Sequence, residues 1–361
     1  MTIRLRHDIL TLDLRDPFVI ARADHARAGG ARGESITTVI VEVEADDLPG
    51  IIGYGEGYPD AFYGESPETM KRAWPELFQL TEGFEFELEN VGTASAALSA
   101  LADQWAAALP NNGAAKCALD IAFHDLAAKA LGLPLYELLG LSPDGPPTDF
   151  SLGIDEPAVV AKRAARAAEF PALKIKVGGP ADLETLRAVR AVYDGPLRVD
   201  ANTGWTPDDA VGMLAALVEL GVELIEQPFP ADRLDELRRF QAQSPLPIVA
   251  DESCVMAADL DGLVGVVAGV NVKLAKCGGV GPAARMLARA RELGFRTFLG
   301  CMEETSVGIA ASVAVASLAE WVDLDGNLLI ARDPFEGLEL GPDKRWLLPA
   351  APGLGVHRRV A

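Results

Sequence analysis

The chain has 361 residues and a formal net charge of −21 at pH 7, which argues against nucleic acid or an anionic membrane surface as a partner. Hydrophobic residues make up 49% and charged residues 24%, the composition of a globular protein with a large core. No apolar run approaches the ~20 residues that cross a bilayer, and the first residues lack the apolar segment of a secretory signal. Cys117, Cys254, Cys277 and Cys301 are scattered without paired spacing, which predicts free thiols in a reducing cytoplasm.

The chain up to about residue 145 predicts an antiparallel sheet followed by helices. Residues 7–14 and 35–45 alternate apolar and polar side chains, which is typical of strands with one buried face. Residues 18–35, rich in Arg and Gly, and residues 53–66, rich in Gly, show no period, so we expect irregular loops there. Helical spacing follows at 67–80, 94–109 and 114–132, and the run SPDGPPT predicts a hinge into the next unit.

From residue 148 onward, strand and helix patterns alternate at intervals of roughly 24 residues. The predicted strands are 148–153, 172–177, 196–200, 222–226, 247–251, 269–274, 295–300 and 320–324. Helices fill the gaps, for example at 158–169, 181–193, 207–220, 232–242 and 281–293. Eight strands at this spacing favour a closed parallel β/α barrel over an open doubly wound sheet. In such a barrel the C-terminal ends of the strands meet on one face, where active sites are built.

Three carboxylates stand at the ends of three successive predicted strands. Asp200, Glu226 and Asp251 close the runs PLRVD, ELIE and PIVAD. On a barrel they would converge on one pocket, and three hard oxygen ligands suit Mg²⁺. The alternative is that each carboxylate is structural, in a salt bridge or at a helix N-terminus. Three of them in register favour the metal site.

Lysines flank these carboxylates on other predicted strands. Lys174 and Lys176 lie two residues apart, so their side chains point to the same side, and two close ammonium groups beside a dication should lower each other's pKa. Lys273 lies on the sixth predicted strand, across the barrel from the second. Inverting a stereocentre requires one base to remove the α-proton and another to return a proton from the opposite face. Lys276 is a second candidate, but it falls in the Gly-rich run after the strand, so we prefer Lys273.

The motifs KIKVG, VDANTGW, IEQPF, ADES, NVKLAKCGG and PLYELLG resemble those of the enolase superfamily, in its muconate-lactonizing branch, over nearly the whole chain. The resemblance implies an α/β fold: a TIM-like (β/α)7β barrel at 116–330 and an N-terminal α+β capping domain at 1–115, on which residues 331–361 pack back. It implies Lys176 as the catalytic base, Lys174 as its charged neighbour, and Mg²⁺ as the cofactor that stabilises the enolate. No histidine stands at a predicted strand end, which disfavours the histidine base of the mandelate racemase branch.

Within that branch, the ending VDLDG resembles the dipeptide epimerases, whose eighth strand offers two aspartates to the substrate's ammonium group. The resemblance therefore implies Asp323 and Asp325 as substrate-binding residues. After the seventh predicted strand, Glu303 and its neighbour Glu304 are candidates to line the same pocket. The N-terminal loop carries an apparent insertion, DHARAGG, and its candidates to meet an anionic substrate side chain are Arg22, Arg27 and Arg32.

We therefore expect a Mg²⁺-dependent dipeptide epimerase that inverts the α-carbon of the C-terminal residue of an L-Ala-L-Xaa dipeptide by two-base proton transfer. The alternatives on the same barrel are an N-acylamino acid racemase, an o-succinylbenzoate synthase or a cycloisomerase. A non-catalytic binding barrel would have lost at least one of the site positions, and none is lost. The expected partner is a small-molecule dipeptide rather than nucleic acid or a membrane, and we expect a cytoplasmic homo-oligomer.

Overall fold

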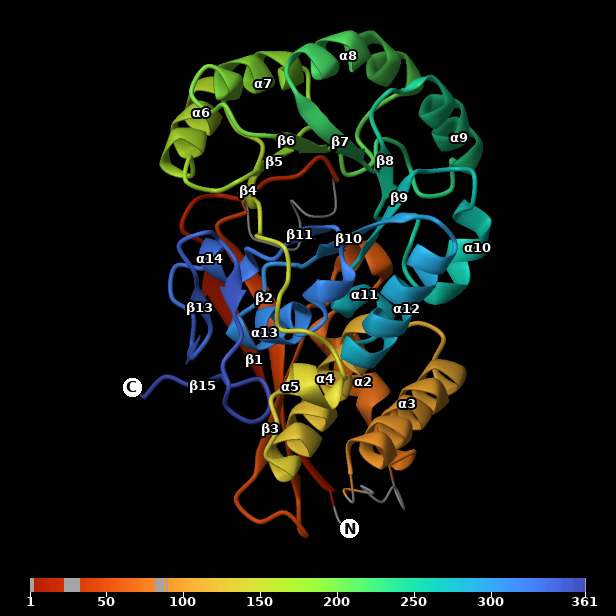
Figure 1. The fold of residues 1–361 in the computed structure, drawn as a ribbon, viewed down its shortest axis with the longest axis vertical. Coiled ribbons are helices and arrows are strands. Elements are labelled where there is room, and N and C mark those ends of the chain that lie inside the picture. Colours follow the sequence, from red (N-terminus) through yellow and green to blue (C-terminus); the bar gives the residue numbers. More distant parts are fainter. Residues whose placement is uncertain (1–2, 23–32, 82–87, 89, 361) are drawn as a thin grey trace.

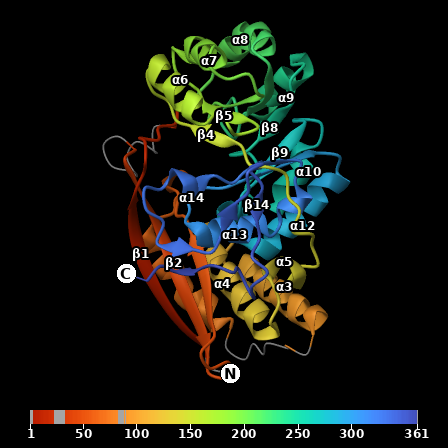
Figure 2. The same ribbon diagram turned by 60° about the vertical axis from the view of Figure 1, so that its left-hand side comes forward.

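The structure is a computed structural model that describes residues 3–22, 33–81, 88 and 90–360. Figures 1 and 2 show two parts that follow each other along the long axis: a parallel β/α barrel, and an antiparallel sheet with its helices. Among the helices that the structure describes, none combines the length and the apolar character needed to cross a membrane.

The N-terminal sheet has three antiparallel strands in the order β1 (Ile3–Asp13), β2 (Ser35–Ala45) and β3 (Ile52–Gly57). The two strands predicted from alternation are confirmed as β1 and β2. The prediction of an irregular loop beginning at residue 53 is wrong for residues 53–57, which form most of β3 and pair with β2.

Glycines on β3 let helix α4 (Gly113–Leu131) lie directly against the sheet. A Cβ atom on Gly53, Gly55 or Gly57 would come within 2.2 Å of a backbone carbonyl oxygen of this helix. The facing residues are Ala122, Ala118 and Ala114, so a stripe of small residues on the helix meets a stripe of glycines on the strand. Because glycine lacks the side chain that makes a strand recognisable, this strand resembles a loop in the sequence.

Three further helices complete this part of the molecule: α2 (Pro67–Gln79), α3 (Val91–Ala108) and α5 (Leu135–Leu138). Helices α2 and α3 each begin with a capping box, formed by Ser66 with Thr69 and by Asn90 with Thr93. Residues 114–128 of α4 are all buried, because β3 covers one face and neighbouring helices cover the others. The helices predicted in this region are confirmed, with α3 beginning earlier than predicted.

The barrel is a parallel sheet of eight strands that lie side by side in chain order. Its strands are β4 (Phe150–Leu152), β5 (Leu173–Lys176), β6 (Leu197–Asp200), β7 (Val222–Glu226), β8 (Ile248–Ala250), β9 (Gly269–Val272), β10 (Arg296–Gly300) and β11 (Trp321–Asp323). A parallel bridge between Thr148 and Val322 joins the chain before β4 to β11 and closes the barrel. The predicted (β/α)7β barrel with an N-terminal α+β part is confirmed.

Helices connect the strands on the outside of the barrel. They are α6 (Pro157–Arg166), α7 (Asp182–Arg190), α8 (Pro207–Glu219), α9 (Leu234–Gln243), α10 (Leu260–Leu263), α12 (Val280–Glu292) and α13 (Ser306–Val313). The short helices α11 (Leu274–Cys277) and α14 (Gly326–Leu329) follow β9 and β11, and single 3-10 turns lie at Ala61–Tyr63, Ala257–Asp259 and Ala316–Leu318.

The C-terminal residues form two small antiparallel pairs, β12 (Phe335–Glu336) with β15 (His357–Arg358) and β13 (Glu339–Leu340) with β14 (Trp346–Leu347). Arg358 donates hydrogen bonds to Asp8 at 2.6 Å and to Glu42 at 3.1 Å, so this segment contacts the N-terminal sheet. The expected domain boundary between residues 115 and 116 falls inside α4, and the division into domains stays a prediction.

Candidate active site

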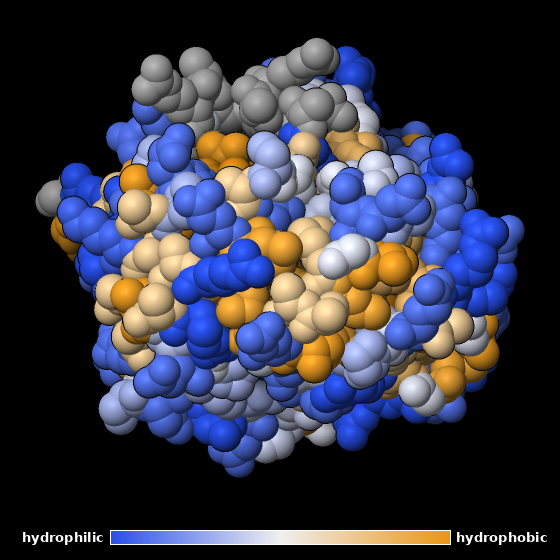
Figure 3. Space-filling view, turned by 90° about the horizontal axis from the view of Figure 1, so that it is seen from above, coloured by the Kyte–Doolittle hydropathy of each residue, from blue (hydrophilic) through white to orange (hydrophobic). Residues whose placement is uncertain are grey.

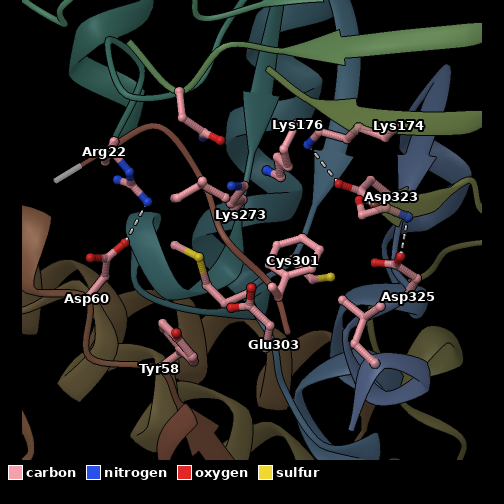
Figure 4. Close-up of a pocket in the computed structure, with 16 residues that line it drawn as sticks. Arg22, Tyr58, Asp60, Lys174, Lys176, Lys273, Cys301, Glu303, Asp323 and Asp325 are labelled. Carbon is pink, nitrogen blue, oxygen red and sulfur yellow. Dashed lines mark hydrogen bonds and ion pairs between the residues drawn. The ribbon is translucent and has the colours of Figure 1, made fainter. Parts of the chain in front are cut away.

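A cavity lies at the C-terminal ends of the barrel strands, with walls from both parts of the molecule (Figure 4). It is lined by seven of the predicted catalytic and substrate-binding residues: Arg22, Lys174, Lys176, Lys273, Glu303, Asp323 and Asp325. The three carboxylates predicted to bind metal do not line the cavity themselves, but they contact the lysines that do. Arg27 and Arg32 lie outside the described residues.

Two groups of residues in this site are named here. The strand-end cluster consists of Lys174, Lys176, Asp200, Glu226, Asp251 and Lys273. The capping end consists of Arg22, Tyr58, Asp60 and Glu303. Figure 4 shows Arg22, Tyr58 and Asp60 on one side of the cavity and Asp323 and Asp325 on the other, with Lys273 and Glu303 between them.

The three carboxylates of the strand-end cluster are 0–1% exposed. Asp200 and Glu226 are register partners on the parallel strands β6 and β7, and Asp251 directly follows β8. Neighbouring amides orient them: the Asn202 backbone N–H donates to Asp200 at 3.0 Å, and the Asn271 side chain donates to Glu226 at 2.7 Å. The β/α repeat alone therefore brings three acidic side chains onto adjacent strand ends.

Lys174 is the most enclosed of the lysines, at 1% exposure. Its Nζ lies 2.8 Å from Glu226, 3.2 Å from Asp200 and 2.8 Å from Asp323. Burial favours the neutral amine, but these carboxylates outweigh burial and raise the pKa of Lys174. These carboxylates lie within 3.2 Å of Lys174 Nζ, whereas the lowered pKa predicted for this lysine requires a dication beside it and stays a prediction.

Lys176 and Lys273 reach the cavity from strands β5 and β9, which are separated by three strands. Lys176 Nζ lies 2.6 Å from Asp200, and Lys273 Nζ lies 2.9 Å from Asp251. Burial opposes the charge on Lys273, but Asp251 and more distant carboxylates outweigh it, so its pKa is raised.

Lys276 has a different environment from Lys273. It lies in α11 rather than in a loop, and its ammonium donates to the Asp251 carboxylate and to three backbone carbonyls, of Asp251, Asn271 and Cys254. It is not among the residues that line the cavity. Lys276 therefore holds the end of β8 in place, and Lys273 is the lysine that faces the cavity.

The three carboxylates fit Mg²⁺ by the chemistry of their donors. They supply buried hard oxygens, and Glu226 Oε2 accepts no hydrogen bond although it lies 2.8 Å from Lys174 Nζ. In the described part of the chain, however, no group of three such side chains is positioned to hold a metal ion directly. The lysine ammonium groups contact the same oxygens, so metal binding requires these side chains to exchange ammonium contacts for metal contacts.

Asp323 and Asp325 end β11 and begin the following turn. The Ser151 hydroxyl donates to Asp323 at 3.1 Å, and the Ser151 backbone N–H donates to Asp325 at 2.6 Å. Burial works against ionising Asp323, but Lys174 outweighs it and lowers its pKa. For Asp325, burial and the neighbouring Asp323 charge raise the pKa. The pair therefore presents one firmly ionised carboxylate to the cavity.

At the capping end, Arg22 is 9% exposed and already has acidic partners. Its guanidinium lies 3.0 Å from Asp60 and 3.5 Å from Glu252, and it stacks over the Phe62 ring at 4.5 Å. The structure therefore places Arg22 at the cavity as predicted, but with its charge offset by two carboxylates.

Glu303 and Glu304, adjacent in sequence, have different surroundings. Glu303 lines the cavity beside Tyr58, whereas Glu304 is absent from the lining and is buried near Glu56. Burial first, and then the Glu56 carboxylate, raise the pKa of Glu304 to about 8. The expectation that both line the pocket is thus correct for Glu303 and wrong for Glu304, because the turn after β10 sends the two side chains to opposite sides.

Glu56 of β3 anchors that turn to the N-terminal sheet. Its buried carboxylate accepts hydrogen bonds from the Thr38 hydroxyl, from the Thr305 backbone and hydroxyl, and from the Gly308 backbone. The Thr305 and Gly308 donors lie at the start of α13, where backbone N–H groups lack helical partners. Glu56 therefore positions residues 301–305, which carry Glu303.

Comparison with known proteins places this architecture in a family. A model described as "Enolase C-terminal domain-like" matches residues 158–359, and one described as "Mandelate racemase / muconate lactonizing enzyme, N-terminal domain" matches residues 13–140. The chain belongs to the enolase superfamily, in its mandelate racemase / muconate lactonizing enzyme group. The resemblance inferred from the strand-end motifs is confirmed.

Superfamily relatives cover almost the whole chain. It is 40% identical over 325 residues to an L-Ala-D/L-Glu epimerase from Bacteroides thetaiotaomicron, covering 89% of this chain and 82% of the relative. A dipeptide epimerase structure from Enterococcus faecalis, complexed with Mg and L-Leu-L-Tyr, has a TM-score of 0.85 at 33% identity and covers 99% of both chains. An N-succinyl Arg/Lys racemase from Bacillus cereus also has a TM-score of 0.85, at 29% identity, covering 99% of this chain and 96% of the other.

Several residues of this superfamily site were not predicted from the sequence. Asn271 lies two residues before Lys273 on β9, so the period of two that placed the lysine would also have placed the amide. Tyr58 and Asp60 directly follow β3, but the glycines of that strand concealed where it ends. Ser151 occupies the first barrel strand, where a lone serine gives no chemical signal.

Proposed function

We propose that this protein is a Mg²⁺-dependent dipeptide epimerase, which inverts the α-carbon of the C-terminal residue of an L-Ala-L-Xaa dipeptide. One observation carries the proposal. Lys176 and Lys273, which come from two strands with three strands between them, share one cavity with Asp323 and Asp325. The similarity to relatives named as dipeptide epimerases supports it.

In this proposal Lys176 and Lys273 exchange the α-proton. The neutral form of one lysine removes the proton from one face, and the ammonium form of the other returns a proton to the opposite face. Asp200 and Asp251 hold the two Nζ atoms at 2.6 and 2.9 Å, which fixes their directions. Lys174, surrounded by three carboxylates, stays charged and stabilises the negative charge that develops on the substrate.

Asp200, Glu226 and Asp251 would hold Mg²⁺, together with water and substrate oxygens. Bound there, the ion would polarise the substrate carboxylate as a Lewis acid and offset the negative charge that raises the pKa of Lys174 and Lys273. Their burial at adjacent strand ends and the hard oxygen donors support this assignment.

Asp323 and Asp325 would bind the free α-ammonium of the dipeptide through charge-assisted hydrogen bonds. Ser151 holds both carboxylates, and the ionised Asp323 supplies the negative charge. The second candidate function is an N-acylamino acid racemase, which the similarity to the N-succinyl Arg/Lys racemase favours. An N-acyl group carries no positive charge at this position and gains nothing from the aspartate pair.

A panel of free L,L-dipeptides and N-acylamino acids, incubated with Mg²⁺ in deuterated water, tests the proposal. Proton NMR reports loss of the α-proton of the C-terminal residue and formation of the L,D epimer. We expect both for free dipeptides and much slower exchange for N-acylamino acids. Equal turnover of the N-acyl compounds would favour the racemase, and no exchange in either series would reject both functions.

We further propose a cytoplasmic homo-oligomer with neither nucleic acid nor membrane as a partner. The cysteines Cys117, Cys254, Cys277 and Cys301 are free, which suits a reducing compartment. Figure 3 shows an apolar area among polar side chains, and Val211 and Val218 of α8 are 46% and 45% exposed. Light scattering on the purified protein would measure the oligomeric state, and a monomer would contradict this part of the proposal.

A further inference from the structure

We infer that the capping end of the cavity selects dipeptides whose C-terminal residue carries a cationic side chain, lysine or arginine. The inference rests on the proposed epimerase function and names the substrate class of that same site. It is carried by the environment of Glu303, a buried carboxylate on the cavity wall.

Glu303 has no cationic partner among the residues that the structure describes. It is 7% exposed and lines the cavity, and the Tyr58 hydroxyl donates a hydrogen bond to it. The four cations that line the cavity are paired with other carboxylates: Arg22 with Asp60, Lys174 with Glu226, Lys176 with Asp200 and Lys273 with Asp251. No ion pair joins Glu303 to any residue that the structure describes. A buried carboxylate without a positive partner is costly, so the group that enters this end of the cavity should supply one.

The net charge of the capping end points the same way. Among the four residues of the capping end, all of them in the described part of the chain, Arg22 is the one cation. It pairs with Asp60 and Glu252, and Glu303 lines the same cavity. Without Glu252, the capping end still has two carboxylates, Asp60 and Glu303, and one guanidinium, that of Arg22. An anionic substrate side chain would add a third negative charge beside Asp60 and Glu303, whereas an ammonium or guanidinium group would neutralise the excess.

The geometry of the cavity directs the substrate side chain to this end. Figure 4 places Asp323 and Asp325 on the side opposite to Arg22, Tyr58 and Asp60, with Lys273 between the two sides. A dipeptide whose ammonium group binds the aspartates and whose α-carbon lies between the lysines must extend its C-terminal side chain toward the capping end. Tyr58 and the Glu56 anchor hold Glu303 in position to receive that side chain.

Competition among four dipeptides tests the inference on the Mg²⁺-loaded enzyme. The substrates are L-Ala-L-Lys, L-Ala-L-Arg, the uncharged and similarly long L-Ala-L-Met, and L-Ala-L-Glu, and kcat/KM is measured from α-proton exchange in deuterated water. We expect lysine and arginine to exceed methionine by about 10-fold or more and glutamate to be the poorest, because a charge-assisted hydrogen bond in a buried site contributes one to two decades of discrimination.

Variants assign the preference to Glu303. Glu303→Gln should reduce the ratio of kcat/KM for L-Ala-L-Lys to that for L-Ala-L-Met by about 10- to 100-fold. Tyr58→Phe, which removes only the hydrogen bond to Glu303, should reduce the same ratio by a smaller factor and serves if Glu303→Gln fails to fold. Glu219→Gln, an exposed carboxylate at the end of α8, is the matched control and should leave the ratio unchanged.

The outcomes separate the two proposals. Turnover of dipeptides with glutamate preferred, or a lysine-to-methionine ratio that survives Glu303→Gln, would overturn the cationic subsite and leave the epimerase function standing. Absence of exchange with every dipeptide would overturn both.

Discussion

The strand-end cluster and the capping end of the same cavity are built in different ways. The strand-end cluster comes from one repeated unit. Its charged side chains lie at or just after the ends of parallel strands, apart from Lys174, which lies two residues before the end of β5. The capping end is assembled from three separate segments: the loop that carries Arg22, the turn after β3, and the turn after β10. Each of these segments is held by contacts distant in sequence.

This difference indicates a division of labour. In the strand-end cluster every lysine has a carboxylate partner within 3.2 Å, so the positions of acids and bases depend on one another and tolerate little change. At the capping end, side chains such as Glu303 and Arg22 lie on connecting segments outside the barrel strands, where sequence varies more readily. The reacting groups thus lie on the barrel strands, and the residues proposed to select the substrate lie on turns that meet the barrel.

Substitution of the two facing lysines should have the largest effect. Lys176→Ala should slow the exchange of one epimer's α-proton with deuterium by at least ~100-fold, and Lys273→Ala should slow that of the other epimer equally. The reason is that each base serves one face of the α-carbon. NMR exchange measured separately from the L,L and L,D epimers checks this. Lys162→Ala, an exposed lysine of α6, is the control. Full epimerisation in both directions by either lysine variant would contradict the two-base scheme.

Loss of a metal ligand should come next. Glu226→Gln should weaken Mg²⁺ binding, measured by calorimetry, and reduce kcat/KM by about 100-fold, since Lewis-acid stabilisation is worth several kcal/mol. Chelation of the metal should abolish the activity of the wild type, and added Mg²⁺ should restore that activity. Activity that survives exhaustive chelation would show that the strand-end carboxylates serve only to hold the lysines.

At the ammonium end, a smaller loss is expected. Asp323→Asn should reduce kcat/KM for L-Ala-L-Xaa dipeptides by about 10- to 100-fold, because a charge-assisted hydrogen bond of roughly 1.5–3 kcal/mol is lost. N-acylated analogues, which lack the ammonium, should lose less. Asp208→Asn, at an exposed position of α8, is the control. A silent Asp323→Asn would support the racemase instead.

The anchor between the two regions should act on substrate binding. Glu56→Gln places an amide N–H₂ against donors from Thr305 and Gly308, so the turn that carries Glu303 should loosen. We expect KM to rise by about 5- to 10-fold with a smaller change in kcat. Thr38→Val, which removes a single hydrogen bond to Glu56, should have a weaker effect. If Glu56→Gln lowers only thermal stability, Glu56 is structural and does not position the turn.

The smallest effect should appear in the pH dependence of stability. The pKa of Glu304 is raised to about 8, so this group keeps its proton in the folded state between its unfolded pKa and about 8. Its contribution to stability is fully present below the unfolded pKa and is lost as pH rises through about 8. The Tm of Glu304→Gln minus that of the wild type should therefore grow by ~2 °C or more between pH 5.5 and pH 9. Parallel Tm curves for the two proteins would contradict this.

The sequence by itself determined the barrel and most of the strand-end cluster. A β/α repeat is a local pattern, and parallel strands in a closed barrel all end on one face, so placing Asp200, Glu226 and Asp251 at strand ends also placed them together. The two-residue spacing of Lys174 and Lys176 gave their common direction in the same way, since both contact Asp200.

Only the tertiary structure decided the rest, because it depends on contacts between distant segments. The strand at β3 exists because α4 packs on its glycines, and that strand in turn positions Tyr58 and Asp60. The raised pKa of Lys273 and the choice of Glu303 over Glu304 at the cavity depend on which charges and turns surround each side chain in space. Ion pairing weakens steeply with distance, so no local pattern could show that Arg22 is paired with Asp60, 38 residues away, while Glu303 has no cation beside it among the described residues.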